Sequence, residues 1–109
     1  MQEKEKLPAC PVETALLFLK DKWQVLIYRE LLTGTKRFSE LKKALAPVSQ
    51  KMLTQNLREL EERGMIERKV YPVVPPKVEY SLTPLGETMA PVIDALKHWG
   101  EMYKAKNKE

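Results

Sequence analysis

The stretch SQKMLTQNLRELEERG, residues 49–64, contains the start, the periodicity and the end of one amphipathic helix. Ser49 is suited to cap this helix, because its hydroxyl can accept a hydrogen bond from a free N–H group of the first turn. Gly64 is the residue type that most often follows the last turn of a helix. Three leucines recur at helical spacing and predict its buried side: Leu53, Leu57 and Leu60.

The opposite side of this helix carries residue types that read DNA. At about 100° per residue, Lys51, Gln55 and Arg58 lie opposite the leucines, with Thr54 beside them. Gln can bond adenine in two places, Arg can bond guanine through both arms of its fork, and Lys and Thr supply phosphate or mixed contacts. Residues 41–58 include no carboxylate that would repel phosphates. The other reading is an ordinary polar outer face, since most amphipathic helices bind nothing.

A shorter helix precedes this one and a hairpin follows it. Phe38, Leu41 and Leu45 share a helical period that ends at Ala46-Pro47, because a residue before proline is pushed out of the helical region. After residue 64 the period changes to two, which predicts a strand over 78–82 with 65–71 as its hairpin partner.

The proline-rich loop 72–76 between these strands should form an exposed tip. Arg68, Lys69 and Lys77 flank it, where a wing could reach phosphates or a neighbouring minor groove. Helix, turn, helix and hairpin in this order predict a mainly α-helical winged helix-turn-helix fold with a small β-hairpin wing.

The first and last helices carry more apolar side chains than one small core can shelter. Cys10-Pro11 should begin a helix that runs to about Lys20, and Thr83-Pro84 should begin another that extends for about five turns to Tyr103. We expect both helices to pack against their copies across a two-fold axis. Such a homodimer would place its recognition helices about 34–36 Å apart, the spacing of successive major grooves.

Length and composition predict one domain over residues 10–109 behind a flexible leader at 1–9. The chain has 109 residues, 43% hydrophobic and 31% charged, and no apolar run approaches the roughly 18 residues of a membrane span. This indicates a soluble, cytoplasmic protein without a membrane partner. A net charge of +4 and a pI near 9.2 are compatible with a polyanionic partner.

The sequence offers little to catalysis or to metal binding. His98 is the single histidine, without a second nitrogen or sulfur ligand at helical spacing, so it is best read as a partly exposed helix residue. The sequence has no Ser/His/Asp catalytic set beyond this one histidine and no glycine-rich phosphate-binding loop. We therefore expect neither enzymatic activity nor a cofactor. Cys10 is the lone cysteine, so any disulfide that it made would join two molecules.

These residues together resemble the HxlR-type winged helix-turn-helix regulators, relatives of the MarR group. The matching stretches span nearly the whole chain in the family's order: CPVE at 10–13, KW at 22–23, RFSEL at 37–41, SQKMLTQNLRELEERG at 49–64, VPPKVEYSLTPLG at 74–86, and Trp99. The resemblance implies a homodimeric bacterial or archaeal transcription factor. Its recognition helix would enter the major groove of double-stranded DNA, and its wing would lie alongside.

The resemblance also implies which residues contact DNA. Its recognition-helix positions fall on Ser49, Gln50, Lys51, Thr54, Gln55 and Arg58, and its flanking phosphate contacts fall on Arg37 and Lys77. The sequence departs from the family pattern at three places. Asp21 replaces a common Gly, Ala46-Pro47 replaces a Gly-containing turn, and Val73 lies at a tip that is often polar.

Cys10 matches an N-terminal cysteine that senses electrophiles, aldehydes or oxidants in several members of the resembled family. A thiol at a helix N-terminus gains thiolate character, the form that reacts. Glu13, one turn away, opposes this effect. The alternative is an unreactive residue that caps or packs the first helix.

The sequence predicts a dimeric regulator that binds a palindromic DNA operator sequence-specifically. Repression is favoured over activation. A small electrophile or oxidant is the effector that Cys10 suggests. The competing hypothesis is a winged-helix module that docks other proteins. Such a module would suit an apolar or acidic recognition face, and this face is neither.

Overall fold

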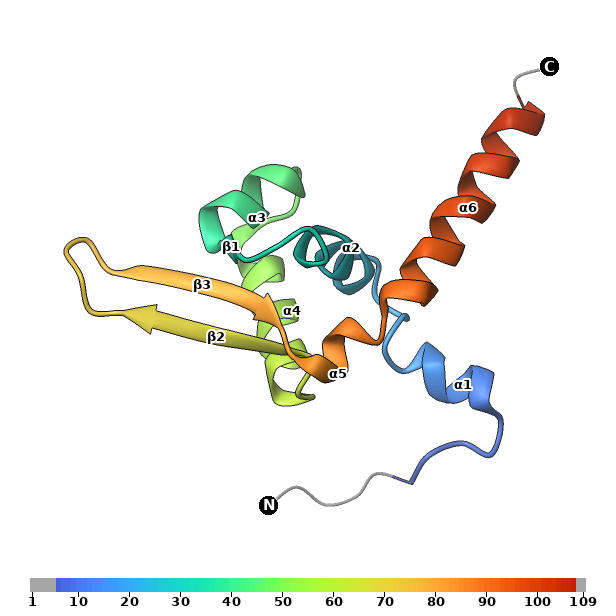
Figure 1. The fold of residues 1–109 in the computed structure, drawn as a ribbon, viewed down its shortest axis with the longest axis horizontal. Coiled ribbons are helices and arrows are strands. Elements are labelled where there is room, and N and C mark those ends of the chain that lie inside the picture. Colours follow the sequence, from blue (N-terminus) through green and yellow to red (C-terminus); the bar gives the residue numbers. More distant parts are fainter. Residues whose placement is uncertain (1–5, 108–109) are drawn as a thin grey trace.

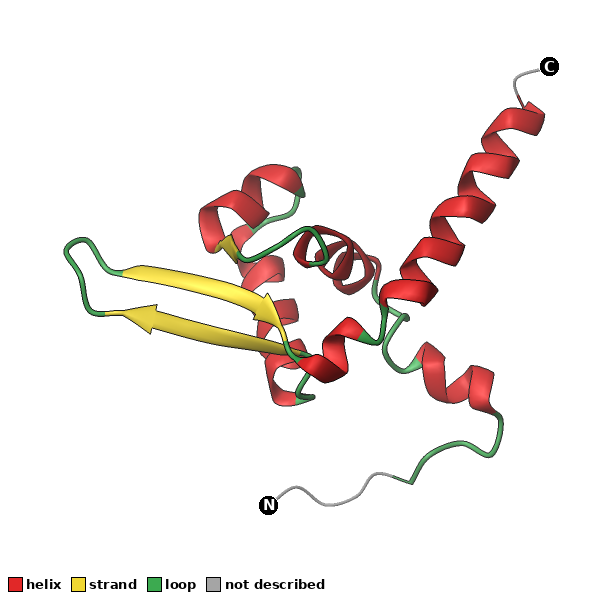
Figure 2. Cartoon of the chain, in the orientation of Figure 1, coloured by secondary structure: helices red, strands yellow, loops and turns green. Residues whose placement is uncertain are grey.

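The computed structural model describes residues 6–107, which form short helices around a small sheet and one long helix (Figures 1 and 2). Residues 6–9 of the predicted leader precede the first helix without regular structure, and its residues 1–5 lie outside the described part. The elements are α1 (Pro11–Leu16), α2 (Lys22–Leu31), β1 (Lys36–Arg37), α3 (Phe38–Ala44), α4 (Gln50–Glu62), β2 (Ile66–Tyr71), β3 (Lys77–Leu82), α5 (Pro84–Glu87) and α6 (Ala90–Asn107). The predicted winged helix-turn-helix fold is confirmed: α3 and α4 form the motif, and β2 and β3 form the wing.

Helix α4 has the predicted limits and the predicted buried side. The Ser49 hydroxyl accepts the Met52 N–H at 3.0 Å and so caps the first turn. At the other end Gly64 adopts a φ of +80°, a conformation that side-chain-bearing residues rarely adopt. The three leucines of the buried side are at most 2% exposed. They pack against Ile27 and Tyr28 of α2 in one apolar core.

The sheet contains one strand that the sequence pattern did not predict. Strand β3 lies in the middle and pairs in antiparallel fashion with β2 and with the two-residue β1. Two residues are too few for a period of two to be recognised. The hairpin tip between β2 and β3 projects from the body, with Val74 99% exposed, as expected (Figure 1).

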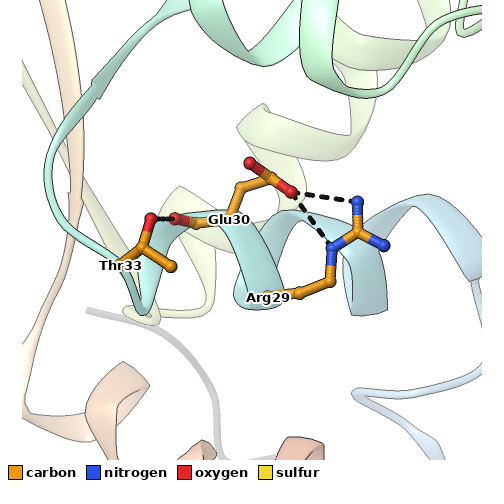
Figure 3. A network of polar contacts seen from close by, with 3 residues as sticks. All are labelled: Arg29, Glu30 and Thr33. Carbon is orange, nitrogen blue, oxygen red and sulfur yellow. Dashed lines mark hydrogen bonds and ion pairs between the residues drawn. The ribbon is translucent and has the colours of Figure 1, made fainter. Parts of the chain in front are cut away.

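Polar contacts fix both ends of α2. The Asp21 carboxylate accepts the Trp23 N–H at 2.8 Å, so the aspartate that departs from the family pattern serves as the N-cap of this helix. At the C-terminal end the Thr33 hydroxyl donates to the Glu30 carbonyl at 2.7 Å, and the Arg29 guanidinium donates to the Glu30 carboxylate (Figure 3). The Asp21 cap satisfies a free N–H group of the first turn of α2, and the contacts at the other end are local and exposed.

Tyr28 of α2 is a core residue with an unusual polar atom. Its side chain is fully buried, and its hydroxyl has no hydrogen-bond partner among residues 6–107. Burial raises the pKa of Tyr28 to about 12, and the nearby Arg63 charge opposes the shift in part.

The first helix is shorter than predicted: α1 ends at Leu16 rather than near Lys20. The N–H groups of Leu17, Phe18 and Leu19 bond carbonyls three residues back, which tightens the chain into turns before α2 begins. These turns bring Phe18 and Leu19 against the core, a tertiary gain that the local pattern does not reveal.

The single helix expected from Pro84 to Tyr103 is also wrong, because the structure breaks it into α5 and α6. Pro91 explains the break, since it has no N–H for the carbonyl four residues back and its ring would clash with that carbonyl. The N–H groups of Thr88 and Met89 instead bond carbonyls three residues back. The predicted Thr83 cap is confirmed, with its hydroxyl accepting the Gly86 N–H at 3.0 Å.

Helices α1 and α6 lie largely outside the core. Neither contains a buried residue, and α6 projects away from the body on the side opposite the wing tip (Figure 1). Large apolar side chains on both helices are about half exposed or more: Val12, Leu16, Leu96, Trp99, Met102 and Tyr103. No helix within residues 6–107 is long and apolar enough to cross a membrane.

Candidate nucleic-acid interface

The outer side of α4 gathers the residues predicted to read DNA. One shallow depression on this helix is lined by five of them: Gln50, Lys51, Thr54, Gln55 and Arg58. Thr54 is partly buried and the other four are exposed. Ser49 adjoins them as the N-cap. This surface thus combines hydrogen-bonding side chains with the N-terminal end of a helix, whose dipole and free N–H groups favour anions.

A second groove runs between α4 and the wing. Three of the same residues line it from the helix, together with Arg68 from β2 and Val78 and Tyr80 from β3. Arg68 lines this groove, whereas the sequence predicted only that it flanks the wing tip. Its place in the groove follows from the pairing of β2 with β3. Arg68 lies opposite Tyr80, so both side chains share the face of the sheet that meets α4.

The absence of carboxylates holds for the N-terminal half of α4 but not for the whole groove. Glu61, in the acidic C-terminal half of α4, is exposed and lines the groove between helix and wing along with Arg58. A polyanion would therefore meet cations near the N-terminus of α4 and one carboxylate at the far end.

Arg37 and Lys77 do not line either depression. Arg37 is the N-cap of α3, where its N–H donates to the Glu40 carboxylate at 2.8 Å, and its side chain is exposed. In the sheet it lies opposite Glu79. Its position at the start of the helix-turn-helix motif leaves the guanidinium free to reach outward.

Lys77 is held by neighbouring groups at the base of the wing tip. Its Nζ lies 3.6 Å from the Glu79 carboxylate and 4.5 Å from the centre of the Tyr71 ring. Lys69 lies over the same ring at 5.3 Å. Two ammonium groups thus share one aromatic platform, an arrangement that orders long, flexible side chains.

Cys10 is the N-cap residue of α1, and its thiol is free and exposed. It makes no side-chain capping hydrogen bond, and it does not pack into the protomer. Among the described residues, no group of His, Cys, Asp and Glu side chains is arranged to hold a metal ion. His98 is exposed and faces Asp94 at 3.4 Å, one helical turn away.

Comparison with known proteins agrees with this geometry. Residues 18–108 match the HxlR-like helix-turn-helix family. The HTH-type transcriptional regulator YdeP of Bacillus subtilis (strain 168) is 53% identical over 95 residues, which are 87% of this chain and 74% of that protein. The HTH-type transcriptional regulator YtfH of Escherichia coli (strain K12) is 48% identical over 93 residues, which are 85% of this chain and 74% of that protein.

A solved structure with the same fold is the redox regulator HypR in its reduced form. It is 41% identical, with a TM-score of 0.84 over 91% of this chain and 98% of that one. The structure of a MarR-family transcriptional regulator from Porphyromonas gingivalis W83 is also 41% identical, with a TM-score of 0.83. The match covers 91% of this chain and 97% of that one. These relatives are transcriptional regulators rather than enzymes.

Proposed function

Because this chain belongs to the HxlR-like helix-turn-helix family of transcriptional regulators, we propose that it binds a palindromic DNA operator as a homodimer and represses transcription there. The observation that carries the proposal is the set of five hydrogen-bonding side chains on the exposed side of α4, within reach of the wing. A dimer bound to the operator excludes other proteins from the same DNA, and this makes repression the simpler outcome.

Each side chain of the interface has a role in this proposal. Gln55 and Arg58 point outward from α4 and read base edges in the major groove, because both can form paired hydrogen bonds. Ser49, Gln50, Lys51 and Thr54 contact phosphates near the start of the helix, or mix phosphate and base contacts. Arg37 and Lys77 hold the flanking phosphates.

The alternative, a module that docks proteins through the same face, has less support. The buried centre of a protein–protein interface is depleted in charged residues. The depression on α4 is lined only by polar and cationic residues, two of them charged.

The dimer in this proposal uses α1 and α6. Their apolar side chains lie outside the protomer's core, and Trp99 and Tyr103 stack at 5.5 Å on one side of α6. A second copy of the same surface can cover them in an isologous interface. The two α4 helices would then contact successive major grooves on one side of the duplex.

The first test separates base reading from general DNA affinity. Arg58→Ala and Gln55→Ala should each cost about 1–3 kcal/mol of binding to a duplex selected from a random pool, and much less on a scrambled duplex. Lys77→Ala should weaken binding to both duplexes and lower the salt slope by about 1. Fluorescence anisotropy over a salt series measures all three. Equal losses on both duplexes for Gln55→Ala would contradict its role in reading bases.

A second expectation concerns the carboxylate that holds Lys77. Glu79→Gln removes a negative charge 3.6 Å from the lysine ammonium and should raise affinity for any duplex roughly twofold to fivefold at low salt. Glu67→Gln makes the same charge change nearer the base of the hairpin and should have the smaller effect. The two variants are compared with wild type by the same anisotropy titration. Equal gains would mean that net charge alone matters.

We also propose that Cys10 is the residue through which a small electrophile or oxidant acts. Its thiol is exposed at the start of α1, a helix of the proposed dimer interface, so an adduct there would disturb the packing of the two copies. Treatment with N-ethylmaleimide should release the wild-type protein from its selected duplex. Cys10→Ser should stay bound after the same treatment. Release of both proteins, or of neither, would remove Cys10 from the mechanism.

A further inference from the structure

A small polar network lies behind the recognition surface, inside an otherwise apolar contact. Gln24 of α2 is 2% exposed, and Asn56 of α4 is 6% exposed. The Gln24 side-chain amide donates to Asn56 Oδ1 at 3.0 Å and to Glu59 Oε1 at 2.7 Å. The Asn56 amide in turn donates to the Met52 carbonyl at 2.9 Å. Helix α2 is thereby linked to the inner side of the recognition helix by directional bonds.

These bonds restrict a motion that the apolar packing alone would tolerate. Contacts among leucine and isoleucine side chains are non-directional, so they define a small rotation between packed helices less sharply than a hydrogen bond does. A buried amide that loses its partner is costly, because it has already given up its water. The two bonds from Gln24 to α4 therefore oppose rotation of α4 about its own axis against α2.

The rotation of α4 decides where the base-reading side chains point. The two network residues of α4 directly follow the two predicted base-reading residues in the chain: Asn56 follows Gln55, and Glu59 follows Arg58. Side chains reach about 5–6 Å from a helix axis, and a rotation of about 10° then moves their tips by about 1 Å. An error of about 1 Å is enough to spoil a paired hydrogen bond to a base edge.

We propose that Gln24 is a positioning residue for DNA recognition: through Asn56 and Glu59 it sets the rotation of α4, and thereby the discrimination between operator and other sequences. This inference rests on the proposed function. Gln24 lies on the buried side of α2 and outside the recognition surface, so its effect reaches DNA through α4 alone. Phosphate contacts tolerate small displacements better than base contacts do. General affinity for DNA should therefore change little when the network is removed.

Two variants separate positioning from stability. Gln24→Met keeps the length of the side chain but leaves Asn56 Oδ1 buried without its donor, and it should lower the melting temperature. Gln24→Met combined with Asn56→Leu removes both buried partners and should recover much of that stability, because no buried polar group is then stranded. The matched control is Ile27→Val, which trims a fully buried side chain of the same helix and leaves the network intact.

The measurement is the ratio of affinities for the duplex selected by wild type and for a scrambled duplex of the same composition. We expect this ratio to fall about tenfold in both network variants, which is the effect of losing one base contact. The affinity for the scrambled duplex should stay unchanged. Ile27→Val should keep the wild-type ratio. Recovery of the ratio together with stability in the double variant would overturn the proposal and leave Gln24 a purely structural residue.

A measurement on the protein without DNA tests this inference separately from the proposed function. Backbone amide chemical shifts along α4 should change in Gln24→Met, which leaves the sequence of α4 intact, and far less in Ile27→Val. If wild type shows no preference for any selected duplex, the proposed function fails, and these shifts still test whether the network sets the rotation of α4. Unchanged α4 shifts in Gln24→Met would overturn the positioning role whatever the binding data show.

Discussion

Replacing Gly86 with alanine should lower the free energy of unfolding by about 3 kcal/mol, at the high end of the usual range for overpacked cores. A Cβ at this position would lie 2.0 Å from the Met65 carbonyl oxygen and 3.1 Å from a Leu82 methyl group. The leucine can rotate away, but the carbonyl cannot. It accepts the Thr83 N–H at 3.1 Å and fixes the start of β2 against α5. The methyl can be accommodated only by moving α5 off the sheet.

Chemical denaturation followed by circular dichroism measures this loss. Gly100→Ala is the matched control, because a Cβ at that position of α6 would meet nothing within 4 Å. The control should be neutral or gain about 0.5–1 kcal/mol, since alanine favours a helix interior over glycine. Equal stabilities of Gly86→Ala and wild type would show that α5 is not packed on Met65 as the structure has it.

The second large effect is expected at the proposed dimer interface. Trp99→Glu puts a charge into the apolar surface of α6 and should convert the dimer to a monomer, because an unpaired charge in a dry interface is strongly unfavourable. Operator affinity should fall by at least about 100-fold, since each monomer then binds one half-site without the gain from a linked second site. Trp99 is 61% exposed in the protomer, so the protomer's own fold should survive.

Sedimentation velocity and operator titration measure the two parts of this prediction together. Ala105→Glu adds the same charge to α6 on a different side of the helix and should leave a dimer with nearly wild-type affinity. A monomeric wild-type protein at micromolar concentration would contradict the proposed assembly. A dimeric Trp99→Glu protein would place the interface on another surface.

Local sequence features predicted most of the helix-turn-helix and the wing. Ser49, the leucine period and Gly64 fix α4 within one stretch of chain, and alternation fixes β3. The side of α4 that carries Lys51, Gln55 and Arg58 follows from the same period, because burial of the leucines leaves the opposite side exposed. These residues line one depression, as the helical period requires.

The errors lie where a local pattern competes with a distant contact. The apolar run Leu16–Leu19 continues the periodicity of α1, but packing of Phe18 on the core makes the chain turn. Pro91 is visible in the sequence, yet the stripe of apolar residues around it suggested one continuous helix. Strand β1 forms because β3 offers it an edge, and nothing within its two residues signals that partner.

The sequence by itself determined the limits of α4, the two strands of the wing and the side of α4 that faces outward, because caps, glycines and hydrophobic periods act within a few residues. Only the tertiary structure decided that Arg68 shares the groove with Arg58, that Gly86 lies on the Met65 carbonyl, and that Gln24 meets Asn56 across 32 positions of the chain. These pairings depend on strand register and on helix packing, which join residues that no local pattern connects.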